Sequence, residues 1–363
     1  MLGELPAAGK WQTRAMKRHR PPRLPAGALL AAALCAALQP AGAAPTGLQP
    51  EVVFSADTPL AASGELPRRT LTPLDYSRVQ QELMRRGETL AARLVDLAAE
   101  RFVLYVPRQP PPRGYALLVF VPPWHDARLP QGWSSVLDRF GMIYVSAAHS
   151  GNVENVSERR EPLALLGAHN VMQRYAVDLR HVYVGGFSGG SRVALRLAVA
   201  YPDLFHGALL DAGGDPLGIP GVAIPPADLM QQLQQASRLV YVTGERDQVQ
   251  TSDVQSRQSL RKWCVLNVVS QTALGRSHEA LDSFALASAL RSLTAPLQPD
   301  AAALGHCRAA IEHDLDAELG KVHALLDAGQ RAQAQKLLGD IDRRFGGLAA
   351  PRSIELQQAV ETP

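Results

Sequence analysis

The sequence HVYVGGFSGGSRVALRLAVA, residues 181–200, decides the fold class of this chain. Residues 182–184 are β-branched and aromatic, which is typical of a strand, and apolar side chains recur at helical spacing from Ser191 onward. Between them lies Gly186-Phe187-Ser188-Gly189-Gly190, which fits the pattern G-x-S-x-G. A strand before this pattern and a helix after it are the context in which such a serine serves as a nucleophile.

The glycines around Ser188 have a physical reason. A nucleophile held on a strained turn needs neighbours without a Cβ, so that strand and helix can approach and the serine can point outward. The following helix directs its N-terminal amides at the space beside Ser188, where an oxyanion would develop. The alternative is a glycine-rich turn with a solvated serine. A phosphate-binding loop is disfavoured because neither G-x-G-x-x-G nor G-K-[ST] occurs here.

The N-terminal 43 residues have the composition of a signal peptide. A basic cluster follows Met16, which could be the true start, and precedes an apolar run over residues 26–38. That run is shorter than the ~20 residues that span a bilayer, but it suits a signal peptide, and Ala41-Gly42-Ala43 is an A-x-A cleavage site. We therefore expect cleavage after Ala43 and export to the periplasm or the medium.

Charge and cysteine content narrow the classes of partner. The expected signal peptide holds six basic residues and one acidic residue, so its removal lowers the net charge from +3 to −2. Neither nucleic acid nor a membrane surface is then an expected partner. Cys264 and Cys307 are the two cysteines of the mature chain, and an oxidising compartment favours a disulfide between them. Two cysteines cannot make a zinc site, and no metal is expected.

The hydrophobic pattern predicts an α/β chain with appended segments. Residues 44–89 form an extended and helical lead-in, with an expected edge strand at 51–55 and a helix at 75–86, and a hairpin is expected from 90–97 and 101–107. Continuous apolar runs then alternate with helical segments, which predicts a doubly wound, mostly parallel sheet. The later expected strands are 117–121, 142–146, 207–211, 239–243 and 263–269.

A helical tail follows the prolines at 296 and 299. Apolar residues recur at helical spacing on both sides of residues 327–330, which predicts a helical hairpin over 301–355. A single helical pair cannot bury its own apolar face. The tail should therefore dock on the sheet domain or contact a protein partner.

Chain order identifies partners for Ser188. A serine hydroxyl needs a base, and the base needs a carboxylate to orient it; in this kind of sheet the order is Ser, then Asp or Glu, then His. His278 follows the last expected strand and precedes the last helix of the sheet domain. Four carboxylates compete for the acid: Asp247 is preferred because it lies just after strand 239–243, whereas Asp211, Glu245 and Asp253 are alternatives.

An oxyanion hole requires two backbone amides near Ser188. One should be that of Gly189, and the other should come from the loop that follows strand 117–121. That loop begins Pro122-Pro123, and proline has no N–H, so Trp124 is the first available donor, with His125 next. Phe187, His125 and His149 are expected to line the substrate site, with Trp124 as a further apolar wall.

These residues resemble a known superfamily. Tyr105-Val106-Pro107, the segment from Val177 to Gly190 and Tyr201-Pro202-Asp203-Leu204-Phe205 look like α/β-hydrolases, and most of all like secreted polyhydroxybutyrate-depolymerase and feruloyl-esterase-type enzymes. The resemblance covers residues 90–295, which would be the catalytic domain. It implies an eight-stranded type of sheet, Ser-Asp-His catalysis and no cofactor. Those esterases usually carry His-Gly where this chain has Pro122-Pro123-Trp124.

The leading functional hypothesis is a serine esterase acting on a small or oligomeric ester through an acyl-enzyme. An acyltransferase or peptidase with the same triad is the chemical alternative. An exported binding protein without activity, whose helical tail recruits a partner, is the alternative from another class.

Overall fold

A computed structural model describes residues 44–62, 64–88 and 95–361 of the chain. The expected signal peptide, with Met16 and the cleavage site after Ala43, lies outside the described residues. So does most of the first arm of the hairpin expected at 90–97.

Eight strands of the described chain form one sheet in the order β1-β2-β4-β3-β5-β6-β7-β8. Their bounds are β1 (Gly47–Val52), β2 (Phe102–Val106), β3 (Tyr115–Val121), β4 (Met142–Ala147), β5 (Val177–Phe187), β6 (Gly207–Asp211), β7 (Arg238–Gly244) and β8 (Val268–Ala273). β1 and β2 pair antiparallel, β2 pairs antiparallel with β4, and every pairing from β4 to β8 is parallel. The crossed order of β4 and β3, with a reversed β2, decides the architecture. This is the α/β-hydrolase fold.

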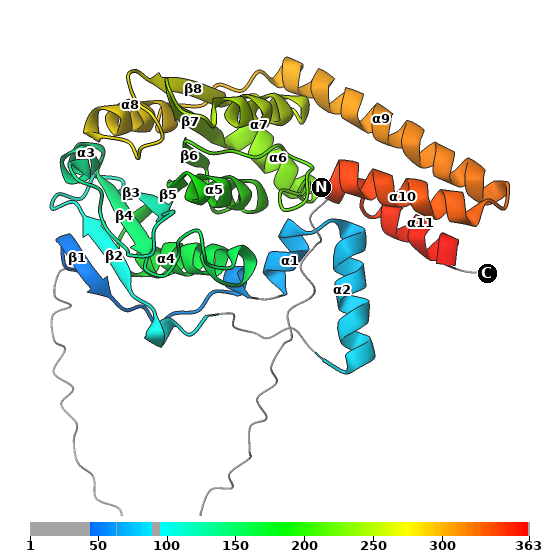
Figure 1. The fold of residues 1–363 in the computed structure, drawn as a ribbon, viewed down its shortest axis with the longest axis horizontal. Helices are drawn as coiled ribbons and strands as arrows, with labels where there is room; N and C mark the ends of the chain where they lie inside the picture. Colours follow the sequence, from blue (N-terminus) through cyan, green and yellow to red (C-terminus); the bar gives the residue numbers. More distant parts are fainter. Residues whose placement is uncertain (1–43, 63, 89–94, 362–363) are drawn as a thin grey trace, which may run out of the picture. The chain divides into compact units, whose positions relative to one another are not determined.

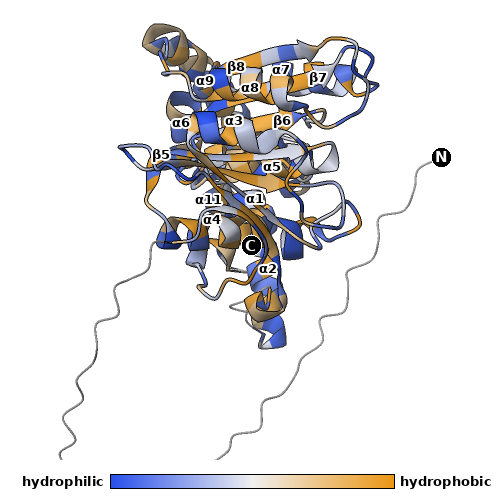
Figure 2. Cartoon of the chain, turned by 90° about the vertical axis from the view of Figure 1, so that its left-hand side faces the viewer, coloured by the Kyte–Doolittle hydropathy of each residue, from blue (hydrophilic) through white to orange (hydrophobic). Residues whose placement is uncertain are grey.

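Helices cover both faces of the sheet (Figure 1). They are α3 (Trp133–Phe140), α4 (Glu161–Arg174), α5 (Gly189–Ala200), α6 (Ala227–Ala236), α7 (Gln250–Lys262) and α8 (Ser283–Leu293). Alternate residues of β3 separate the two faces, because successive side chains in a strand point to opposite sides. Leu117 and Val119 pack in the core that includes α4 and α5, whereas Leu118 and Phe120 pack in the core that includes α3 and α8. β2, β3 and β4 are accordingly buried along their whole length, and apolar residues are concentrated within the sheet (Figure 2).

Three expected strands near the ends of the sheet differ from the structure. The edge strand lies at Gly47–Val52, earlier than the expected 51–55. β2 pairs with β1 and β4, and residues 95–97 are not a strand, so the expected hairpin is wrong over its described part. The expected strand 263–269 is β8, which begins only at Val268. Residues 263–265 are buried in the turn that ends α7, and Cys264 there has a positive φ of 63°.

The tail contains one more helix than the expected hairpin. α9 (Ala301–Asp327) and α10 (Arg331–Phe345) form the hairpin, and α11 (Arg352–Glu361) packs against α10 and α2 (Pro73–Arg86) of the lead-in; α1 (Glu65–Thr70) precedes α2. The apolar stripe of the tail belongs to the same core as α4 and α5. The ring of Phe345 stacks edge-on against Trp263 at 5.8 Å between centroids. The tail therefore docks on the sheet domain.

Two features of the chain concern its environment. Cys264 and Cys307 form a disulfide with Cα atoms 5.8 Å apart, which joins the end of α7 to α9, as the sequence predicts. Among the described residues, no helix is both long enough and apolar enough to cross a membrane.

Candidate active site

Ser188 lies on a strained turn between β5 and α5. Its φ of 55° and ψ of −122° lie outside the regions that L-residues normally occupy. Glycines at two flanking positions make the turn possible: a Cβ on Gly186 would lie 2.3 Å from the carbonyl of Gly190, and a Cβ on Gly190 would lie 1.9 Å from the carbonyl oxygen of Val121. Strand β3 and helix α5 therefore approach closely enough to expose the serine above the sheet.

Ser188, His278 and Asp247 form a hydrogen-bonded line. His278 Nε2 lies 2.8 Å from Ser188 Oγ, and His278 Nδ1 lies 3.0 and 3.1 Å from the two carboxylate oxygens of Asp247. The side chain of Asp247 is fully buried, while that of His278 is 32% exposed. A buried carboxylate on Nδ1 fixes the imidazole so that Nε2 can accept the serine proton.

Two loops hold the imidazole and the carboxylate together. Residues after β7 and residues before His278 are joined by backbone hydrogen bonds, Arg246 N to Arg276 O at 2.9 Å among them. The Gly275 amide donates to the Glu245 carboxylate at 2.8 Å. Gly244 permits this approach, because a Cβ there would lie 2.4 Å from the carbonyl oxygen of Ser277. Glu245 thus holds the loop in place, and no hydrogen bond among the described residues joins it to His278.

Asp211 and Asp253, the other two carboxylates weighed for the acid, have different partners. Asp211 ends β6 and accepts the Leu281 amide at 3.0 Å. Burial, with the charge of nearby Asp247, raises the pKa of Asp211 well above its usual range. Asp253 accepts the Thr243 hydroxyl at 2.6 Å, and burial raises its pKa to about 6. Neither makes a hydrogen bond to His278 in the part of the chain described.

The loop expected to supply the oxyanion hole adjoins Ser188. Gly189 begins α5, where the first-turn amides have no acceptor within the helix. Neither backbone nor side-chain acceptors engage the amide of Trp124 among the described residues. The loop is anchored by its carbonyls instead: Pro123 O accepts the Asn152 amide at 3.0 Å, and His125 O accepts the His149 amide at 2.7 Å. Both expected amides are free to bind an anion.

Arg160 holds this loop in place, and the sequence analysis did not single it out. Its side chain is 3% exposed and donates to Pro122 O at 3.0 Å and to Ser150 O at 2.9 Å. Burial lowers the pKa of Arg160 to about 10, which leaves it charged at neutral pH. The visible signal is the charged pair Arg160-Glu161, at which the apolar helix α4 begins. Charged residues at the start of a helix are usually exposed, whereas both of these residues are buried.

The expected substrate-lining residues form two ring contacts in the loops near the serine. Phe187 contacts both the ring of Trp124, at 6.2 Å between centroids, and that of His278, at 5.0 Å. His125 and His149 lie edge to face at 4.0 Å. Asn152, which the sequence did not single out, packs on Gly189, where a Cβ would lie 2.2 Å from its Oδ1. Phe187 and Trp124 thus contribute apolar surface next to His278, and Asn152 contributes a polar group next to Gly189.

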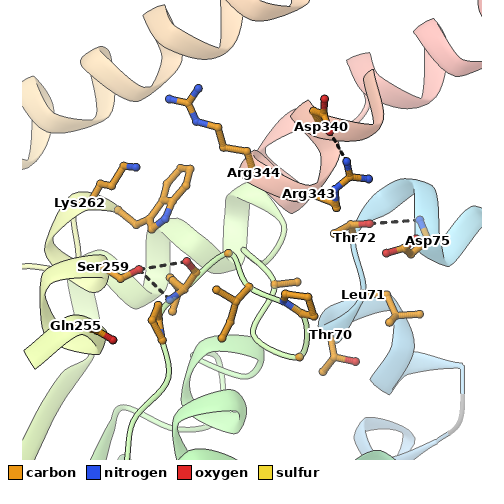
Figure 3. Close-up of a pocket in the computed structure, with 18 of the residues that line it drawn as sticks. Thr70, Leu71, Thr72, Asp75, Gln255, Ser259, Lys262, Asp340, Arg343 and Arg344 are labelled. Atoms are coloured by element: carbon orange, nitrogen blue, oxygen red, sulfur yellow. Dashed lines mark hydrogen bonds and ion pairs between the residues drawn. The ribbon is translucent and has the colours of Figure 1, made fainter. Parts of the chain in front are cut away.

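Two cavities differ in their relation to Ser188. One of about 490 Å³ is lined by Trp124 and its following loop and by Ala280, Leu281 and Asp282, just after His278. Another, of about 860 Å³, lies between the lead-in, the loop after β6, α7 and α10. Figure 3 shows it, with Lys262 and Arg344 on one side and the bonded pair Asp340 and Arg343 near Thr72. Neither cavity is lined by Ser188, His278 or Asp247, but the smaller one is lined by Trp124, whose ring contacts Phe187, and by Ala280, two positions after His278.

Comparisons with known proteins agree with the resemblance seen in the sequence. A poly(3-hydroxybutyrate) depolymerase of Ralstonia pickettii is 31% identical over 98 residues, a match that covers 23% of this chain and 20% of that protein. The chain thus spans about a fifth of the length of the curated relative it matches. No family model matches.

Solved structures similar to this chain have low sequence identity to it. A ferulic acid esterase of Anaeromyces mucronatus is 13% identical to this chain, with a TM-score of 0.41. The match covers 55% of this chain and 85% of the esterase. A prolyl endopeptidase is 10% identical, with a TM-score of 0.37. The match covers 49% of this chain and 33% of the endopeptidase. The strand order, not these likenesses, carries the assignment of the fold.

Proposed function

We propose that this protein is a serine hydrolase that cleaves carboxylic esters through an acyl-enzyme on Ser188. The observation that carries the proposal is the line from Asp247 through His278 to Ser188, with 2.8 Å between Nε2 and Oγ. Nucleophile, base and orienting acid are then in hydrogen-bond contact at the carboxyl ends of parallel strands, where sites in such sheets lie.

The proposed reaction has two halves. His278 Nε2 takes the hydroxyl proton as Ser188 Oγ bonds to the ester carbonyl carbon, and the tetrahedral intermediate collapses when His278 gives that proton to the departing alcohol. Water then adds to the acyl-enzyme while His278 again takes a proton. The carboxylic acid leaves as Oγ regains the proton. Asp247 stabilises the positive imidazolium in both halves without itself being protonated.

The developing oxyanion is proposed to bind the amides of Gly189 and Trp124. The proline pair at 122 and 123 removes two donors, so the loop must be fixed through its carbonyls, as the bonds from Arg160 and Asn152 do. Fixed donors need no reorganisation as charge develops, which is the main source of their effect. Trp124 and Phe187 would add an apolar surface for the acyl or alcohol group.

An ester panel tests the proposal. Wild type should release product from p-nitrophenyl esters of graded chain length and from aryl esters, and Ser188→Ala should lose this activity by several orders of magnitude. Adding a primary alcohol or a peptide substrate separates the chemical alternatives: transfer to the alcohol in preference to water would indicate an acyltransferase, and faster amide cleavage a peptidase. Absence of turnover on every ester, by folded protein, would favour the inert binding protein.

We also propose that the protein is exported. The basic and apolar residues before Ala44 support this, as does the Cys264–Cys307 disulfide, because disulfides persist in oxidising compartments. N-terminal sequencing of protein recovered outside the cytoplasm should begin at Ala44. Cytoplasmic protein with residues 1–43 still attached would contradict both the cleavage and the destination.

A further inference from the structure

The 490 Å³ cavity beside Trp124 is built between two anchored walls. One wall is the loop Trp124 to Gln131, and the other is Ala280 to Asp282. Tyr144, which is fully buried, donates its hydroxyl to Arg128 O at 2.8 Å. Trp133, also fully buried, donates its indole N–H to Leu281 O at 2.8 Å. The rings of Trp133 and Tyr144 contact each other, with 6.0 Å between their centroids. Both walls of the cavity are therefore hydrogen-bonded to the same pair of buried aromatic side chains.

Arg128 lies at the rim of this cavity over the ring of Trp124. Its Cζ is 4.2 Å from the ring centroid. Stacking uses the face of a guanidinium and leaves its N–H groups free around the edge, where they can meet a carboxylate in a bidentate pair. Within the described residues, Arg128 has no carboxylate at ion-pair distance. It is therefore a preoriented cation whose hydrogen-bond donors are unused.

The one other charged residue that lines the cavity does not form an ion pair with Arg128. Asp282 also lines the cavity, but its Oδ1 accepts the Ala285 amide at 2.9 Å as the cap of α8. Its Oδ2 lies 3.6 Å from Arg276 Nη1. The remaining lining residues are uncharged: Trp124, Leu129, Pro130, Gln131, Ala280 and Leu281. A cavity lined mainly by apolar residues, with one guanidinium at its rim that has no ion-pair partner among the described residues, suits a chain that ends in a carboxylate.

We propose that the substrates of this enzyme are esters that carry a carboxylate, bound in this cavity with Arg128 as the specificity-determining residue. The proposal rests on the proposed esterase function of Ser188. The cavity adjoins the reacting atoms, because Trp124 contacts Phe187, the residue before the nucleophile, and Ala280 follows His278 by two positions. Monoesters of dicarboxylic acids and esters of hydroxy acids with a free carboxyl group share this chemistry.

Two matched pairs of substrates test the proposal and show whether the carboxylate belongs to the acyl group or to the alcohol group of the ester. The acyl-side pair is the mono-p-nitrophenyl ester of glutaric acid and the same compound with its carboxyl group methylated. The alcohol-side pair is the acetyl ester of para-hydroxybenzoate and its methylated form. In one of the pairs, wild type should prefer the carboxylate in kcat/KM by about tenfold, the effect of one charge-assisted bidentate contact. Salt should reduce this preference.

Variants at Arg128 give the decisive comparison. Arg128→Gln should bring the preference close to unity with little change for the methylated ester, and Arg128→Lys should keep only part of it. Arg291→Gln removes a charge at the far end of α8 and should change nothing. Glutarate titrated into Ser188→Ala gives a readout without turnover, and adding Arg128→Gln should weaken its binding about tenfold.

The outcomes separate the two proposals. If wild type hydrolyses the methylated esters but shows no carboxylate preference in either pair, or keeps the preference in Arg128→Gln, the carboxylate site is wrong and the esterase proposal stands. If no ester is hydrolysed but glutarate binding depends on Arg128, the esterase proposal fails while the anion site remains. If no ester is hydrolysed and glutarate does not bind, or binds equally well without Arg128, the carboxylate site is wrong as well.

Discussion

Asp211 and Asp247 follow neighbouring strands and both are buried, yet they occupy different electrostatic environments. Asp247 bonds both oxygens to His278 and accepts the Val249 amide at 3.0 Å, so its negative charge is compensated. Asp211 accepts only the Leu281 amide, and burial raises its pKa. The two carboxyl groups therefore differ in their partners, because Asp247 is paired with the imidazole whereas Asp211 is buried beside it with a raised pKa.

This difference predicts opposite results from the same substitution. Asp247→Asn should lower kcat by roughly a thousandfold or more, because it removes the carboxylate that fixes the tautomer and stabilises the imidazolium. Asp211→Asn should stay near the wild-type rate, because no hydrogen bond of the described residues joins Asp211 to His278 and the amide oxygen of asparagine can still accept the Leu281 amide. Steady-state kinetics with unfolding curves for both variants checks this. A near-normal Asp247→Asn beside an inactive, equally stable Asp211→Asn would assign the acid to Asp211.

Asp253 predicts a pH-dependent stability. Its pKa is raised from 3.8 to about 6, so the folded chain holds a proton that the unfolded chain has released. Its carboxylate thus costs stability as pH rises from about 4 to 6, and the cost is complete above that range. Asp253→Asn removes the cost and should stabilise the protein at pH 7 by at most about 3 kcal/mol, with no gain near pH 4.

Urea unfolding of wild type and variant across this pH range measures the effect. Asp228→Asn is the matched control, because Asp228 also lies in the first turn of a helix but is exposed. The account of Asp253 is contradicted if the two variants follow the same pH profile.

Sequence alone places Ser188, Asp247 and His278 together because chain order in this sheet fixes which loops meet. It does not place Arg160 or Arg128. Arg160 donates a hydrogen bond to the carbonyl of Pro122, which lies 38 positions earlier in the sequence. No local sequence pattern predicts that an arginine is buried and bonded to backbone carbonyls. Arg128 depends on the direction of a loop between two aromatic anchors, which only the folded chain sets.

At the level of elements, strand ends were harder to predict than strands. Residues 263–269 are one apolar run, but the first part is buried as a turn because Cys264 takes a left-handed conformation beside Trp263 and the disulfide. Periodicity cannot separate a buried turn from a buried strand when both are apolar. The central strands were predicted well because each is buried on both faces.

The Cys264–Cys307 disulfide should contribute measurably to stability. The cysteines are 43 residues apart in sequence. In the chain-entropy model, closing such a loop lowers the entropy of the unfolded chain and adds about 4 kcal/mol to the free energy of unfolding. Reductant should therefore lower the urea midpoint of wild type. A double variant, Cys264→Ala with Cys307→Ala, should be less stable and insensitive to reductant; equal sensitivity of the two proteins would show that the bond does not form.

At the scale of the whole molecule, the tail and the lead-in stabilise one side of the sheet domain. Asp342 of α10 accepts the Leu74 amide at 3.1 Å and is 1% exposed, and Gly346 and Gly347 pack against the segment from Ile224 to Pro226. The amphipathic pattern predicted that α9 and α10 need a partner. It did not predict α11, which buries Leu356 and Val360 after a short connection.

Truncation after Pro299 should destabilise the protein without touching the chemistry. It removes α9, α10 and α11 and exposes apolar surface that includes Trp263, so solubility and melting temperature should both fall. The rate of the remaining folded enzyme on small esters should be near that of wild type, measured per active site. Loss of turnover at an unchanged melting temperature would place the tail in the active site instead.

The central claim is that Ser188 is a nucleophile activated by His278, and covalent labelling tests it most directly. A fluorophosphonate probe should modify wild type stoichiometrically, with the mass added to the peptide that contains Ser188. Ser188→Ala should not be labelled, and His278→Ala should react far more slowly at unchanged stability. A folded wild type that stays unmodified, or is modified at another serine, would contradict the account.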